Sequence, residues 1–143
     1  MDLKGMVALV TGGNGGLGQR ICHALAQEGA HVAVMYDRSR DQAESVAKEL
    51  TSHYQINAQA FACDITDGAA VDRLVGEVTK AFGRLDVLIN DAAYNISIPF
   101  GDLDNLTLEV WNKIMAINLT GPMRLTKAVA PIMKAQGRGR IIN

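Results

Sequence analysis

Short apolar runs recur along the chain at nearly constant intervals. Continuous runs rich in β-branched residues occupy residues 6–11, 31–36, 58–63 and 85–90, so successive runs begin 25, 27 and 27 residues apart. This interval is typical of βαβ units, in which each strand is followed by a helix. Because the runs are continuous rather than alternating, we expect parallel strands whose two faces are both covered by helices.

The segments between these runs show helical periodicity. Asp67 is positioned to cap the helix that follows the third run, and Gly83 is positioned to end it. The helices after the second and third runs each place their apolar residues along one face, namely Ala43, Val46, Ala47 and Leu50 in the first and Val71, Leu74, Val75, Val78 and Phe82 in the second. Both helices are therefore predicted to pack on the sheet.

A fifth run, residues 140–143, begins 55 residues after the fourth. The interval contains about two helices' worth of sequence between Leu106 and Gln136, with Thr107 as the expected N-cap. The 143 residues, 48% of them hydrophobic, suffice for one domain with a buried core. The sequence therefore predicts one α/β domain over residues 1–143, a Rossmann-type, doubly wound parallel sheet that is incomplete at its C-terminal side.

Composition narrows the classes of partner. A net charge of −1 provides no basic surface for nucleic acid or for an anionic membrane. No apolar stretch approaches the roughly 20 residues that span a bilayer, so we expect a cytoplasmic protein without a membrane segment. The two cysteines and three histidines lack the spacing of metal ligands, and we expect no metal site.

A glycine-rich loop directly follows the first run. It reads Thr-Gly-Gly-Asn-Gly-Gly-Leu-Gly over residues 11–18 and leads into a helix. A diphosphate binds to backbone N–H groups at a helix N-terminus, and only residues without a Cβ let the chain turn and approach closely enough. A tight turn without a ligand is the alternative. The position of the loop at the first strand of a βαβ array favours nucleotide binding.

The spacing Thr-Gly-x-x-x-Gly-x-Gly resembles the short-chain dehydrogenase/reductase family. Three later segments are similar to family motifs: Cys-Asp-Ile-Thr at residues 63–66, Asn-Asp-Ala-Ala at residues 90–93, and Ala-Ile-Asn-Leu-Thr-Gly at residues 116–121. The resemblance runs from residue 4 to residue 143 and is closest to acyl-carrier-protein reductases and to sugar or alcohol dehydrogenases. Asp91 and Ala93 depart from the family's Asn-Asn-Ala-Gly.

The resemblance implies a set of cofactor-binding residues. For Asp64 and Asn90 the sequence leaves open a helix-capping role and a bridging role between loop backbones, respectively. The implied contacts are Gly12, Asn14, Gly16, Leu17 and Gly18 with the pyrophosphate, Asp37 and Arg38 with the adenosine ribose, Asp64 and Ile65 with the adenine, and Asn90 and Ala92 with the nicotinamide-side ribose. Gly15 and Tyr36 complete the set of expected cofactor-binding residues.

Asn118 lies in the segment that resembles the one carrying the family's catalytic Asn. Pro122, four residues later, has no N–H, so a helix that continues through this stretch leaves the Asn118 carbonyl without its usual donor. The resemblance implies that this carbonyl holds a water of a proton relay. Alternatively, one helix ends here and another begins with Pro122 in its first turn. Both descriptions can hold together.

The cofactor is expected to be NADP or NAD. The family's NAD-selecting acid sits at the position that Tyr36 occupies here, and Asp37 comes one residue later. Arg38 has the geometry to bind a 2′-phosphate, whereas Gly15 stands where many NADP-using relatives have a second basic residue. These features lean weakly toward NADP.

Carbonyl reduction by the family uses a Ser and a Tyr-x-x-x-Lys pair, and no tyrosine here has a lysine four residues later. In the family this set follows the strand that begins here at Arg140, so we expect a chain truncated before it and inactive alone. The resemblance implies an NAD(P)-dependent oxidoreductase for ketones and secondary alcohols that forms a homodimer or homotetramer when complete. The alternative is a non-catalytic NAD(P)-binding module that senses cofactor or pairs with another chain.

Overall fold

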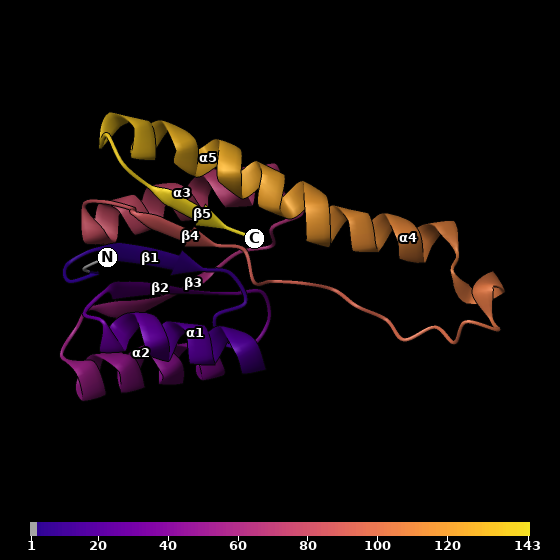
Figure 1. Ribbon diagram of the computed structural model, residues 1–143, viewed down its shortest axis with the longest axis horizontal. Helices are drawn as coiled ribbons and strands as arrows, with labels where there is room; N and C mark the ends of the chain where they lie inside the picture. The colour runs from indigo at the N-terminus through magenta and orange to yellow at the C-terminus, as the bar shows by residue number, and fades with distance from the viewer. Residues whose placement is uncertain (1–2) are drawn as a thin grey trace.

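The structure, a computed structural model, describes residues 3–143 and is built on a five-stranded parallel sheet (Figure 1). The strand order is β3-β2-β1-β4-β5. The chain winds outward from β1 to β3 and then returns to place β4 on the other side of β1, so the winding direction changes between β1 and β4. The strands are β1 (Val7–Val10), β2 (His31–Tyr36), β3 (Ala58–Ala62), β4 (Val87–Ile89) and β5 (Arg140–Ile142).

Helices cover both faces of the sheet. Figure 1 shows α1 and α2 on one face and α3 and α5 on the other, with α4 continuing α5 beyond the sheet. The helices are α1 (Gly16–Gln27), α2 (Arg40–Tyr54), α3 (Gly68–Phe82), α4 (Leu108–Met115) and α5 (Gly121–Ala135), together with a short 3-10 helix η1 (Leu103–Asn105) and a π-helical turn η2 (Ala116–Thr120). The predicted doubly wound α/β fold is confirmed.

Two apolar cores lie on opposite sides of the sheet. All four predicted positions of α2 are buried, as are four of the five predicted positions of α3, where Phe82 packs against the core from a partly buried position. The Asp67 carboxylate accepts the Ala69 N–H, and Thr107 likewise accepts the Val110 N–H. Gly83 ends α3 with a positive φ of 77°. These predicted helix faces and ends are confirmed.

Two strands differ from the prediction. β3 is an edge strand in which only Phe61 is buried, so helices cover its two faces less completely than expected. Phe61 packs in the core on one face, and Ala58 and Ala60 pack against the core on the other. β4 is shorter than the apolar run that predicted it. At the amino end of the sheet, the Leu85 backbone N–H and carbonyl bond to the Gln136 side chain, and the Asp86 carboxylate accepts the Val7 N–H.

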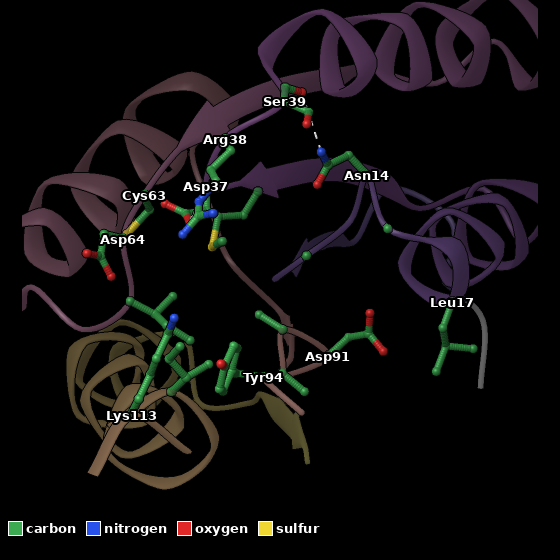
Figure 2. A pocket seen from close by; sticks show the side chains of 17 residues that line it. Asn14, Leu17, Asp37, Arg38, Ser39, Cys63, Asp64, Asp91, Tyr94 and Lys113 are labelled. Carbon is green, nitrogen blue, oxygen red and sulfur yellow. Dashed lines mark hydrogen bonds and ion pairs between the residues drawn. The ribbon is translucent and has the colours of Figure 1, made fainter. Parts of the chain in front are cut away.

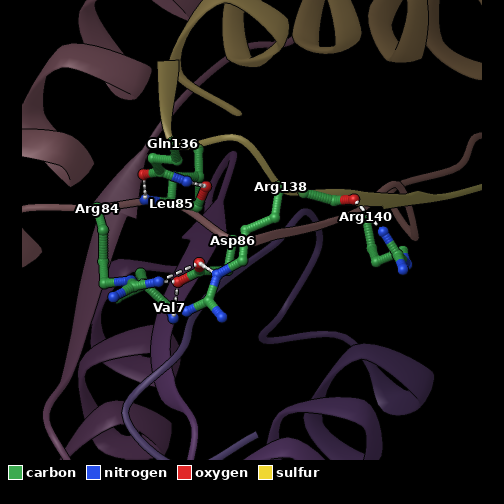
Figure 3. Close-up of polar contacts among 8 residues, drawn as sticks. Val7, Arg84, Leu85, Asp86, Gln136, Arg138 and Arg140 are labelled. Carbon is green, nitrogen blue, oxygen red and sulfur yellow. Dashed lines mark hydrogen bonds and ion pairs between the residues drawn. The ribbon is translucent and has the colours of Figure 1, made fainter. Parts of the chain in front are cut away.

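A buried carboxylate ties β1, β4 and the start of β5 together at this amino end (Figure 3). Asp86 is 3% exposed, accepts the Val7 N–H at 2.9 Å and forms a two-bond ion pair with Arg84 at 2.6 and 2.7 Å. Arg138 approaches the same carboxylate at 3.7 Å. Burial pushes the pKa of Asp86 upward, but these bonds and cations outweigh it and hold the pKa below its ordinary value.

The segment between β4 and α4 runs away from the sheet as an extended arm (Figure 1). It carries exposed apolar side chains, including Phe100 at 98% and Leu103 at 66% exposure. Over residues 3–143, no helix is both long and apolar enough to cross a bilayer.

Candidate nucleotide-binding site

A pocket of about 580 Å³ opens at the carboxyl ends of β1 to β4, where the winding direction changes (Figure 2). In open α/β sheets, ligands bind at this position because the connecting loops diverge there. The lining residues are Gly12, Asn14, Gly15, Leu17, Met35, Asp37, Arg38, Ser39, Cys63, Asp64, Ile65, Asp91, Ala92, Ala93, Tyr94, Lys113 and Ile117. Nine of the predicted cofactor-binding residues are among them: Gly12, Asn14, Gly15, Leu17, Asp37, Arg38, Asp64, Ile65 and Ala92.

Two glycines make the loop after β1 possible. Gly12 has a φ of 63°, which favours glycine, and a Cβ there would lie 3.2 Å from the Ala92 Cα. A Cβ on Gly18 would collide with the carbonyl oxygen of Gly12. Gly18 therefore lets α1 pack tightly against the loop, and Gly12 lets the loop pass next to the segment that follows β4.

The N-terminus of α1 has no side-chain cap. Gly15 occupies the N-cap position and offers no side chain, whereas α3 and α4 are capped by Asp67 and Thr107. A Cβ on Gly16, the first residue of α1, would meet no atom within 4 Å. Uncapped N–H groups carry partial positive charge, so this turn is suited to an anionic group of a ligand.

Thr11 joins the glycine loop to the segment that follows β4. Its hydroxyl is buried, donates to the Ile89 carbonyl at 3.3 Å and accepts the N–H groups of Asp91 and Ala92 at 3.0 and 2.9 Å. This contact spans 80 residues of sequence, and sequence reasoning missed it. It holds two walls of the pocket at a fixed separation.

The adenine-side residues of the prediction come together on the wall formed by β2 and β3. The Thr66 N–H and hydroxyl both donate to Oδ1 of Asp64, at 2.8 and 2.7 Å, and these bonds lower the pKa of Asp64. Asp67 caps α3, so Asp64 does not serve as that cap. Asp37 pairs with Arg38 at 3.2 Å, and both side chains are largely exposed.

Five predicted residues lie outside the pocket lining: Tyr36, Gly16, Gly18, Asn90 and Asn118. Tyr36 is 6% exposed and packs in the core beneath α2, with its hydroxyl accepting Arg40 Nε at 3.1 Å. Asn90 donates from Nδ2 to the Asn143 side chain at 2.7 Å, while its buried Oδ1 has no partner among the described residues. Asn90 therefore does not bridge loop backbones with both ends of its amide.

Asn118 makes the two-ended amide contact instead. Its Nδ2 donates to the Tyr94 carbonyl at 2.9 Å, and its Oδ1 accepts the Tyr94 N–H at 2.8 Å. The helix runs on through Asn118 as a π-helical turn, in which the Gly121 N–H donates to the Ala116 carbonyl. Pro122 then lies in the first turn of α5. The helix therefore continues through Asn118, as one description expects, and Pro122 lies in the first turn of α5, as the other expects. The relay role of the Asn118 carbonyl stays a prediction.

Asp91 and Cys63 line the pocket, whereas Cys22 is buried on α1 outside that lining. Burial raises the pKa of Asp91, whose carboxylate replaces the family's amide. Burial also raises the pKa of the Cys63 thiol to about 11 and that of Cys22 to about 12, so neither thiol is ionised at neutral pH. No cluster of three or more potential metal ligands occurs in the described part of the chain.

Lys113 and Tyr94 form a pair that the sequence analysis did not identify. The Lys113 Nζ lies 4.2 Å from the centroid of the Tyr94 ring, and both residues line the pocket. The available signal was the spacing of Lys113 four residues before Ile117, which places both on one helix face.

The sheet order and the pocket define a parallel α/β protein with a pocket at its topological switch point, where ligands of such sheets bind. Residues 6–143 match the family model described as short chain dehydrogenase, and the chain belongs to this family. The predicted family is therefore confirmed.

The relatives are dehydrogenases and reductases. The chain is 37% identical to D-threitol dehydrogenase of Mycolicibacterium smegmatis, with 99% of this chain and 52% of that protein covered. It also resembles the structure of an NADPH-dependent 3-quinuclidinone reductase from Rhodotorula rubra, with 32% identity, 98% of this chain and 52% of that chain covered, and a TM-score of 0.88. A second similar structure is an NAD+-bound xylitol dehydrogenase, with 31% identity, 99% of this chain and 53% of that chain covered, and a TM-score of 0.89. The chain thus spans about half the length of these relatives. Their names do not favour the alternative of a non-catalytic module.

Proposed function

We propose that this chain binds a nicotinamide dinucleotide in the pocket and forms the cofactor-binding part of an NAD(P)-dependent oxidoreductase. The substrate class is a ketone or a secondary alcohol. The observation that carries this proposal is the uncapped N-terminus of α1, next to a glycine-lined pocket at the switch point of the sheet. The relatives named above, one NADPH-dependent and one NAD+-bound, support the same cofactor class.

The pyrophosphate lies over the glycine loop in this proposal. The first N–H groups of α1 donate to its oxygens, and the glycines leave room for close approach. Asn14 is held in place because its carbonyl accepts Gln19 Nε2 at 2.7 Å and its amide reaches the Ser39 carbonyl at 3.4 Å. We assign to the pyrophosphate the residues that the sequence predicted, namely Gly12, Asn14, Gly16, Leu17 and Gly18.

The adenosine lies against the ends of β2 and β3. Thr66 occupies only Oδ1 of Asp64, so Oδ2 is left to accept the adenine amino group. Asp37 and Arg38 stand at the ribose. We favour NADP for two reasons. The exposed Arg38 guanidinium can donate two hydrogen bonds to a 2′-phosphate, and its ion pair with Asp37 neutralises the carboxylate that would repel that phosphate.

The bound nicotinamide supplies or accepts hydride, and the chain's own contribution to proton transfer is positional. Asn118 fixes the Tyr94 backbone with its side chain, while its carbonyl receives no N–H from Pro122. We assign that carbonyl to a water that relays a proton. The expected Ser and Tyr-x-x-x-Lys are absent from residues 1–143.

A matched pair of glycine substitutions tests the proposal. Gly16→Ala adds a methyl where the pyrophosphate would approach, whereas Gly76→Ala adds one on α3, and neither methyl meets an atom within 4 Å. We expect both variants to melt at or above the wild-type temperature. In a fluorescence titration with NADPH and NADH, Gly16→Ala should bind at least about tenfold more weakly and Gly76→Ala as wild type.

Two results would contradict the proposal. Wild-type protein that binds neither dinucleotide contradicts the cofactor assignment. A folded Gly16→Ala variant with wild-type affinity contradicts the placement of the pyrophosphate. The expected dimer or tetramer is a separate proposal, tested by the molar mass from light scattering.

A further inference from the structure

Lys113 places a cation in the pocket that the proposed function does not use. It lies on α4, and its Nζ is 4.2 Å from the centroid of the Tyr94 ring. Figure 2 shows the two side chains next to each other on the same wall of the pocket. A cation over an aromatic face is held in position electrostatically while keeping its full charge.

The other charges of the pocket do not neutralise Lys113. The lining contains the carboxylates of Asp37, Asp64 and Asp91. Arg38 already pairs with Asp37, and no carboxylate among residues 3–143 forms an ion pair with Lys113. Lys113 therefore supplies a positive charge that is open to an anionic group of the ligand.

The course of the helix places Lys113 on the adenosine side of the pocket. A Cβ on Gly121 would lie 2.7 Å from Ile65 Cδ1, so the start of α5 abuts the wall formed by the end of β3. Ile117, one turn earlier, also lines the pocket. Lys113 lies one turn further, about 12 Å along the helix from Gly121 at about 1.5 Å per residue. It lines the same pocket as Asp64, and Figure 2 draws its side chain between those of Asp64 and Tyr94.

We infer that Lys113, held by Tyr94, binds the 2′-phosphate of an adenosine ribose opposite Arg38 and so makes the pocket selective for NADP. This inference rests on the proposed function. The pyrophosphate is already served by backbone N–H groups of α1, and the 2′-phosphate is the anionic group that distinguishes NADP from NAD. Arg38 offers a planar fork and Lys113 a point charge, and both are suited to phosphate oxygens.

The test compares Lys113→Met with Lys127→Met, which removes an equal charge outside this pocket. Dissociation constants for NADPH and NADH are measured with each variant and the wild type at low and high salt. Lys113→Met should weaken NADPH binding about tenfold at low salt and less at high salt, because an exposed charge is screened. NADH binding should change by less than about twofold, since its 2′-hydroxyl is neutral. Lys127→Met should match wild type, and Lys113→Arg should retain most of the NADPH affinity.

Other outcomes overturn the assignment. An equal loss for NADPH and NADH shows that Lys113 contacts a part that both cofactors share, and no loss for either shows that it contacts neither. A wild-type protein that binds NADH but not NADPH also refutes the inference while leaving dinucleotide binding intact. A wild-type protein that binds neither refutes the proposed function itself. Thermal melts of each variant identify a loss of affinity caused by unfolding.

Discussion

The Asn118 side chain forms two hydrogen bonds with the backbone of Tyr94. Its Nδ2 donates to the Tyr94 carbonyl at 2.9 Å, and its Oδ1 accepts the Tyr94 N–H at 2.8 Å. The contact connects the π-helical turn to the segment that follows β4, which forms a wall of the pocket. The position of Asn118 on the helix therefore sets the position of the Tyr94 backbone. The Tyr94 ring in turn positions the ammonium group of Lys113.

Asn118→Ala removes both of these hydrogen bonds. We expect it to lower the free energy of unfolding by about 1–3 kcal/mol, because each bond contributes about 0.5–1.5 kcal/mol. Urea unfolding monitored by circular dichroism measures the change. Asn112→Ala, an exposed position on α4, is the control and should change stability by less than about 0.5 kcal/mol. Equal stability of Asn118→Ala and wild type would show that the paired contact does not hold the segment.

Thr11→Val replaces the buried hydroxyl with a methyl of similar size. The N–H groups of Asp91 and Ala92 then lose their acceptor, and an unsatisfied buried donor costs about 1–3 kcal/mol. We expect a loss of at least about 2 kcal/mol in the free energy of unfolding, measured from the urea midpoint. Thr11→Ser keeps the hydroxyl and should lose less than about 1 kcal/mol. Similar losses for both variants would assign the effect to packing rather than to these bonds.

Asp86 is expected to make the free energy of unfolding depend on pH in the acidic range. Although burial alone would raise its pKa, the bonds from Arg84 and Val7 hold the pKa below the ordinary value of 3.8. Its stabilising contribution is therefore complete above the unfolded-state pKa and is lost as pH falls through the lowered, folded-state pKa. We expect Asp86→Asn to cost about 3 kcal/mol at pH 7 and progressively less below about pH 4. Urea unfolding over that pH range measures the difference, and a difference independent of pH would contradict this role.

Asp91 should act with the opposite sign. Burial raises its pKa above 3.8, so the fold favours the protonated carboxyl. The corresponding stability is present below the unfolded-state pKa and is lost as pH rises through the folded-state pKa. Asp91→Asn, which also restores the family residue, should therefore be more stable than wild type at pH 7 and similar to it near pH 3. Thermal melting at pH 7 measures the difference, and a lower melting temperature for Asp91→Asn than for wild type would contradict this account.

Local sequence features predicted most of the fold because their physical causes are local. The apolar stripes of α2 and α3, the cap at Asp67 and the stop at Gly83 each depend on residues within a few positions. The loop at Gly12 was predictable for the same reason. The partial exposure of β3 was not, because the edge position of a strand depends on the order of the whole sheet.

The candidate site was predictable in its residues but not in its long-range contacts. Thr11 reaches Ala92 across 81 residues, and Asn118 reaches Tyr94 across 24. A side-chain amide or hydroxyl can bond to almost any backbone group, so the residue type does not specify its partner. Tyr36 was expected among the cofactor-binding residues because it occupies the position of the family's NAD-selecting acid, whereas its ring is buried under α2. The Lys113–Tyr94 pair was missed for a similar reason, because the two residues come from different segments of the chain.

The most direct test of dinucleotide binding is the response of individual amides in solution. Nitrogen–proton correlation spectra of the 15.3 kDa chain, recorded during titration with NADPH, report on each backbone N–H separately. We predict saturable shifts that are largest at Gly15, Gly16 and Leu17 and smaller ones at Ile65 and Ala92, with Gly76 unchanged. Saturable binding whose largest shifts fall away from the start of α1 would contradict the account.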